Sequence, residues 1–170
     1  PISFLQATDT GEKILANLVL DAVNGANRVA DLYCGLGPFS MRMAAHSSVM
    51  SFDSDVESIQ ALKTALDNVQ GQKPVRTEVR DLSKNPLNKS ELEIFDAVVF
   101  NPPRAGAELQ AREIASSEVP RVISVSCNAA TFARDALILI DGGYRLARVT
   151  PVDQFRFAGH VEMVGVFERT

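Results

Sequence analysis

The chain has 170 residues, a formal net charge of −4 and a hydrophobic fraction of 46%, which suits one α/β domain with a single buried core. A pI near 5.2 excludes a basic surface over the whole domain, so any grip on nucleic acid must be local or lie elsewhere. The sequence shows neither an apolar run of membrane-spanning length nor a signal peptide. We therefore expect a cytoplasmic, monomeric protein.

Two further expectations come from single residues. Cys34 and Cys127 are the only cysteines and lie far apart, so we predict neither a metal site nor a disulfide. The chain begins with Pro1 instead of Met, so we expect residues 1–170 to be one catalytic domain, the C-terminal part of a longer protein.

In the first half of the chain, helical and extended patterns alternate. Apolar spacing predicts a helix over 12–23, a strand over 28–33, a helix over 38–45 and a strand over 49–53. A second helix-type pattern begins after Asp55, a suitable N-cap, and runs to Val69 before Gly71 stops it. Residues 75–80 are a third strand. This alternation is typical of a parallel sheet covered by helices on both faces.

The second half continues the alternation. Residues 84–90 read as a polar loop, 95–100 as a strand buried on both faces, 109–117 as a helix and 122–126 as a strand. A helix over 131–140 ends at Gly142 and Gly143. Segments 144–152 and 161–167 leave no room for a helix between them, so they should pair antiparallel. We predict a doubly wound, seven-stranded sheet whose last strand is antiparallel.

Polar residues follow four consecutive strands of this predicted sheet. The first strand ends in a turn with Gly35 and Gly37, the second at Asp53, the third at Asp81 and the fourth at Asn101. Ligands of such sheets bind beyond the carboxyl ends of the strands, and a carboxylate after the second strand accepts hydrogen bonds from ribose hydroxyls. The third glycine of the dinucleotide fingerprint is missing, which argues against NAD. A tight turn and a surface carboxylate are the plainer interpretations.

Four segments near the end of the chain resemble the RNA uracil-5-methyltransferase family, whose members modify tRNA and ribosomal RNA. They are 101–104 (Asn-Pro-Pro-Arg), 126–135 (Ser-Cys-Asn-Ala-Ala-Thr-Phe-Ala-Arg-Asp), 151–155 (Pro-Val-Asp-Gln-Phe) and 160–162 (His-Val-Glu). The resemblance covers essentially the whole chain. It implies a class I methyltransferase fold, S-adenosylmethionine as cofactor and an RNA substrate, gripped mainly by a region outside these 170 residues.

Cys127 and Glu162 have residue types that this chemistry needs. Carbon 5 of uracil becomes a nucleophile when a thiolate adds to carbon 6, and Cys127 lies where a strand gives way to a helix whose N-terminus should favour the thiolate. A base must later remove the proton from carbon 5, a role the resemblance gives to Glu162. An isolated Cys is commonly a small buried apolar residue, and we interpret Cys34 that way.

The resemblance also assigns binding residues. It implies cofactor contacts by Gln6, Tyr33, Gly35, Asp53, Asp81 and Asn101, and substrate contacts by Arg104 and Asn128. The chain departs from the family pattern at Thr8, Pro38, Asn101 and Ala129. Asn101 stands where the family has Asp, which removes a charge beside the cofactor or the uracil. An ordinary salt bridge is the alternative role of Arg104, and we interpret His160 as structural.

Two other functions fit parts of the pattern. The sequence Asn-Pro-Pro followed by an aromatic residue marks amino-group methyltransferases, but here the fourth residue is Arg104, and Cys127 would have no role. An inactive RNA-binding relative would retain the fold, and the changes at Pro38 and Asn101 would suit it. The presence of both Cys127 and Glu162 favours the enzyme.

Overall fold

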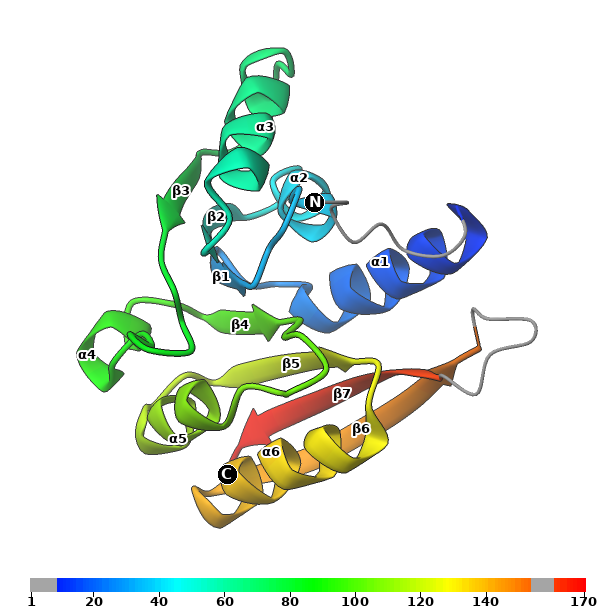
Figure 1. Cartoon of the computed structure of the whole chain (residues 1–170), viewed down its shortest axis with the longest axis vertical. Coiled ribbons are helices and arrows are strands. Elements are labelled where there is room, and N and C mark those ends of the chain that lie inside the picture. Colours follow the sequence, from blue (N-terminus) through cyan, green and yellow to red (C-terminus); the bar gives the residue numbers. More distant parts are fainter. Residues whose placement is uncertain (1–8, 154–160) are drawn as a thin grey trace.

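The computed structural model describes residues 9–153 and 161–170. Its centre is a seven-stranded sheet in the order β3-β2-β1-β4-β5-β7-β6 (Figure 1). The strands are β1 (Arg28–Leu32), β2 (Ser48–Asp53), β3 (Val75–Val79), β4 (Ala97–Phe100), β5 (Arg121–Ser126), β6 (Tyr144–Val152) and β7 (Glu162–Arg169). The first five pair in parallel, and β7 runs antiparallel between β5 and β6. The predicted doubly wound topology is confirmed.

Helices cover both faces of the sheet. They are α1 (Asp9–Val23), α2 (Pro38–Met43), α3 (Val56–Asp67), α4 (Lys89–Leu92), α5 (Glu108–Ser116) and α6 (Ala129–Asp141). One core cluster joins α1 and α2 to the sheet, with α3 on a small cluster beside α2. The other joins α4, α5 and α6 to the opposite face (Figure 1). No helix within residues 9–153 and 161–170 is long and apolar enough to cross a membrane.

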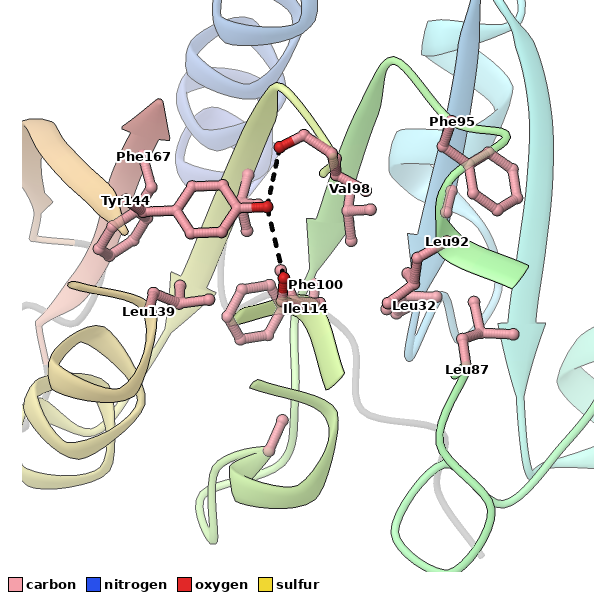
Figure 2. Packing of buried hydrophobic residues seen from close by; sticks show 14 of the residues in the cluster. Leu32, Leu87, Leu92, Phe95, Val98, Phe100, Ile114, Leu139, Tyr144 and Phe167 are labelled. Carbon is pink, nitrogen blue, oxygen red and sulfur yellow. Dashed lines mark hydrogen bonds between the residues drawn. The ribbon is translucent and has the colours of Figure 1, made fainter. Parts of the chain in front are cut away.

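Aromatic and aliphatic side chains fill the α5–α6 face of the sheet. Phe100 and Phe167 are completely buried, and Figure 2 shows them packed with Tyr144 and leucine side chains from several elements. The Tyr144 hydroxyl donates to the Val119 carbonyl at 2.8 Å, so its polar end is satisfied inside the core. This packing fixes α5 and α6, and with them the loops that begin and end at the carboxyl edge of the sheet.

Two predicted boundaries differ because side chains cap backbone groups there. The loop expected over 84–90 ends early, since Asn88 and Glu91 form a capping box that starts α4 at Lys89. The strand expected over 95–100 begins only at Ala97. Before it, the Asp96 carboxylate accepts the Asn27 and Arg28 amides, each at 2.8 Å, and so joins the start of β4 to the start of β1.

Candidate active site

The turn after β1 has an unusual backbone. Tyr33 has φ 60°, the only positive value at a non-glycine in the described chain, and Gly35 and Gly37 follow with φ 53° and 77°. A Cβ on Gly37 would collide with the Leu62 side chain. Three left-handed residues in five turn the backbone sharply at the sheet edge, and the open space around Gly35 allows close approach of a ligand.

Cys34 lies beneath this turn as a packing residue, as expected. It is 5% exposed and contacts Ile59 and Leu62 of α3. Burial is the main cause that raises the pKa of its thiol well above the ordinary value. Cys34 is therefore a poor nucleophile.

Asp53 is held at the end of β2 by two backbone amides. Its Oδ2 accepts the Gly35 N–H at 2.8 Å, and its Oδ1 accepts the Asp55 N–H at 2.9 Å. Asp55, in turn, caps α3 by accepting the Glu57 N–H, which confirms that prediction. Each Asp53 oxygen keeps an acceptor position, so the carboxylate is both fixed and available to hydroxyl groups.

Three carboxylates lie around the half-buried Tyr33 hydroxyl. Burial first, and then the charges of Asp135, Asp81 and Asp53, raise the pKa of Tyr33 to about 12. Asp81 contacts Lys84 at 2.8 Å and Ser83 at 2.5 Å, and these hydrogen bonds lower its pKa to about 2. The sheet edge is thus negatively charged at neutral pH.

A buried carboxyl that the sequence interpretation missed lies at the same edge. Asp31 is 0% exposed, its Oδ2 accepts the Ser40 hydroxyl at 2.5 Å, and its Oδ1 has no hydrogen-bond partner in the described chain. Burial raises its pKa to about 7. The available signal was an Asp inside the apolar strand 28–33, where a charge is costly unless it has a partner.

Asp31 should make stability fall as pH rises. A carboxyl whose pKa is 3.8 unfolded and about 7 folded binds more protons in the folded state, so the free energy of unfolding decreases between about pH 4 and 7 and then levels off. The full difference corresponds to roughly 4 kcal/mol. Asp31→Asn should therefore gain stability relative to wild type across this range in urea titrations. A difference in stability between the two proteins that stays constant with pH would contradict this assignment.

Cys127 and Glu162 lie side by side where β5 and β7 meet. Ser126, the last residue of β5, pairs with Met163 in the antiparallel register, so Cys127, which follows β5, lies beside Glu162. Glu162 is 2% exposed, and burial raises its pKa. Cys127 is partly exposed and free. The two groups that the sequence assigned to one reaction are thus neighbours at the sheet edge.

The environment of Cys127 corrects one expectation. Burial and the Glu162 charge raise the pKa of the Cys127 thiol, and only the Arg104 charge and a backbone hydrogen bond lower it. Asn128 caps α6 and accepts the Ala130 and Thr131 amides at 3.0 and 3.4 Å, so these two amides are already bonded. The balance raises the pKa of the thiol, whereas the helix N-terminus was expected to favour the thiolate.

The loop after β4 brings Asn101 and Arg104 to the same edge. The backbone N–H of Asn101 donates to the Leu32 carbonyl at 3.2 Å, which places Asn101 beside the turn after β1. The Arg104 carbonyl accepts the Asn128 side-chain amide at 3.2 Å. Asn128 thus has a visible structural role, capping α6 and holding this loop, and its predicted contact with substrate stays a prediction. Gln6 and His160 lie outside the described residues.

The order of the strands, the glycine turn after β1 and the acidic residues at the ends of the strands together define a class I S-adenosylmethionine-dependent methyltransferase fold. Magnesium protoporphyrin IX methyltransferase of Synechocystis, at 22% identity, shares that fold with a TM-score of 0.69 over 95% of this chain and 78% of its own. The family model described as tRNA (Uracil-5-)-methyltransferase matches residues 2–170. The chain therefore belongs to the tRNA (uracil-5-)-methyltransferase family, as the resemblance implied.

Similar proteins are longer than this chain. An uncharacterized RNA methyltransferase of Agrobacterium fabrum is 50% identical over 98% of this chain and 40% of its own length. The 23S rRNA (uracil(1939)-C(5))-methyltransferase RlmD of Acinetobacter baumannii is 33% identical over 99% and 38%. The structure of Pyrococcus abyssi tRNA (uracil-54, C5)-methyltransferase in complex with S-adenosyl-L-homocysteine has a TM-score of 0.82 at 28% identity, covering 97% and 40%. The chain spans about 40% of each of these three.

Proposed function

We propose that this domain transfers a methyl group from S-adenosylmethionine to carbon 5 of a uridine in RNA. Cys127 acts as the covalent nucleophile and Glu162 as the general base. The observation that carries the proposal is the pairing of Cys127 with Glu162 at the junction of β5 and β7. This junction adjoins the sheet edge that holds the turn after β1, where ligands of such sheets bind.

Residues at the edge suit the cofactor. Asp53 offers fixed acceptor oxygens for ribose hydroxyls. The unpartnered Oδ1 of Asp31 is an acceptor for an amino group, and a cation there would offset its buried charge. We assign Tyr33, Gly35, Asp81 and Asn101 to the remaining contacts, with Gln6 added by the family resemblance. The negative edge favours a cationic sulfonium ligand over the neutral product that remains after transfer.

Cys127 starts the reaction on the uracil ring. Its sulfur forms a bond to carbon 6, and the electron pair of the ring double bond moves onto carbon 5 and the carbonyl oxygen. Because the pKa of the thiol is raised, its proton must first pass to solvent, and the positive charge of Arg104 is the nearby influence that favours this loss. The bound cofactor supplies the methyl group that carbon 5 then takes up.

Glu162 completes the reaction. Its carboxylate removes the proton from carbon 5, the double bond re-forms, and the bond from carbon 6 to the Cys127 sulfur breaks. Burial raises the pKa of Glu162, which makes its carboxylate a stronger base than one in water. One methyl group is gained and one proton leaves, so the ring returns to a neutral pyrimidine.

RNA recognition divides between this domain and the rest of a longer protein. The net charge of −4 gives little general attraction to phosphates. Within the domain, Arg104 is exposed beside Cys127 and could anchor a phosphate or the target loop. We therefore expect the bare 170 residues to bind RNA weakly, with most positioning contacts supplied from outside them.

The modified nucleoside tests this function directly. The protein is incubated with methyl-labelled S-adenosylmethionine and bacterial ribosomal or transfer RNA, and the RNA is digested to nucleosides and separated by liquid chromatography. We expect the label in 5-methyluridine. Label in a methylated adenine or cytosine amino group would support the amino-group chemistry, and absence of label in RNA would support an inactive relative.

A further inference from the structure

Asp135 is a buried carboxylate on α6 that the proposed chemistry does not use. Its side chain is 4% exposed. Its Oδ2 accepts the Ala107 N–H at 2.7 Å, and its Oδ1 accepts two N–H bonds from the Arg134 guanidinium at 2.9 and 2.7 Å. Ala107 is the N-cap of α5 and has no capping side chain of its own. Asp135 therefore holds the start of α5 from a different helix.

The neighbouring part of the same loop is also held by α6. The Arg104 carbonyl accepts the Asn128 side-chain amide and the Thr131 hydroxyl, both at 3.2 Å. Asn128 directly follows Cys127 and caps α6. The second half of the loop 101–107, from Arg104 to Ala107, is thus bonded to the helix that begins beside the nucleophile.

Gly106 shows how closely loop and helix approach. Its φ is +76°, and a Cβ added there would lie 2.8 Å from Asp135 Oδ2 and 2.9 Å from Thr131 Cβ. The Ala105 carbonyl beside it accepts the Arg134 guanidinium at 3.1 Å. Only glycine fits at position 106, because a side chain there would enter the space of the Asp135 carboxylate.

Asp135 also faces the cofactor side of the edge. Its charge is the largest electrostatic contribution, after burial, to the raised pKa of Tyr33. The Asp135 carboxylate therefore links three parts of the site. It belongs to the helix after Cys127, bonds to the loop after β4, and raises the pKa of Tyr33 in the turn after β1.

We propose that Asp135 is a positioning residue that sets the loop 101–107, and so Asn101 and Arg104, relative to Cys127. The inference rests on the proposed function. Small displacements of such groups slow a reaction strongly, by up to about a hundredfold for 1 Å. Asp135 itself touches neither the uracil ring nor the methyl group in this account. It acts on turnover through the position of the Arg104 charge, which favours loss of the Cys127 proton.

Asp135→Asn tests the proposal. Asn offers one acceptor oxygen, so either the Ala107 amide or the Arg134 guanidinium must face an NH₂ group. Active sites are counted with 5-fluorouridine RNA, so that unfolded protein is excluded. We expect kcat per active site to fall roughly 10- to 100-fold, while the KM for RNA and the Kd for S-adenosylhomocysteine change less than about threefold. The exposed Asp141→Asn, at the end of the same helix, is the control and should retain its kcat.

Gly106→Ala displaces the same loop without changing charge. It should also lower kcat per active site, and the double variant should lose little more than the worse single variant, because both act through one loop. An unchanged kcat per active site in Asp135→Asn together with a lowered Tm would overturn the proposal. The proposal would also be overturned if the losses in kcat of the two single variants multiplied in the double variant.

Hydrogen exchange separates this inference from the proposed function. Amide exchange over 104–107 should be faster in Asp135→Asn than in Asp141→Asn. If the wild type makes no 5-methyluridine, the proposed function fails, and the exchange result alone decides on Asp135. Equal exchange in both variants would then overturn its positioning role.

Discussion

Cys127→Ala should abolish methyl transfer to RNA while S-adenosylmethionine still binds. Loss of a covalent nucleophile typically costs several powers of ten in kcat, so we expect a fall of at least about a thousandfold. The described residues that we propose for the cofactor lie at or just after the carboxyl ends of β1, β2, β3 and β4, so the Kd for the cofactor should change less than about threefold. Label transfer to RNA and calorimetric titration with the cofactor measure the two quantities.

The other cysteine provides the control for this variant. Cys34 is buried against Ile59 and Leu62 and its thiol is not available for attack. Protein that carries Cys34→Ala should still form a covalent complex with 5-fluorouridine RNA, whereas Cys127→Ala should form none. Full methylation by Cys127→Ala would exclude the covalent mechanism.

Glu162→Gln should stop the reaction after methyl transfer. Without a carboxylate the proton on carbon 5 is not removed, so the bond between Cys127 and carbon 6 persists. Removing a general base costs about 10² to 10⁴ in rate, and we expect turnover to fall by that factor. A methylated RNA–protein adduct should accumulate with unmodified RNA and be visible by mass spectrometry and as a slower band in denaturing gels.

Glu168→Gln is the matched control. Glu168 lies on the same strand β7, but its side chain is 41% exposed and contacts Arg145 at 2.6 Å. That variant should turn over as wild type and leave no adduct. Wild-type turnover by Glu162→Gln would exclude Glu162 as the base. Loss of turnover without any adduct would place its role before methyl transfer.

The topology and the cofactor edge were predictable because their signals are local. Glycines at 35 and 37 and acidic residues at 53 and 81 each follow an apolar run, and in a parallel sheet the ends of such runs meet at one edge. The N-cap at Asp55 is a signal of the same kind. Segments 144–152 and 161–167 were correctly expected to be antiparallel because no helix fits between them.

The features of the site that the sequence did not predict depend on contacts between distant segments. Asp135 meets Ala107 across 28 positions, and Asp31 was missed although it stands inside an apolar strand. The pKa of the Cys127 thiol is raised, against the expected direction, because the sulfur is partly buried and the Glu162 charge lies next to it. Both facts depend on side-chain direction and register, which the order of residues alone does not reveal.

A covalent trap with 5-fluorouridine RNA tests the central claim most directly. Fluorine at carbon 5 cannot leave as a proton, so the reaction should stop with the ring bonded to Cys127 and carbon 5 methylated. Mass spectrometry of the digested complex should find one peptide containing Cys127 that carries a methylated 5-fluorouridine, formed only when S-adenosylmethionine is present. Absence of an adduct from protein that methylates ordinary RNA, or an adduct on another residue, would contradict the account.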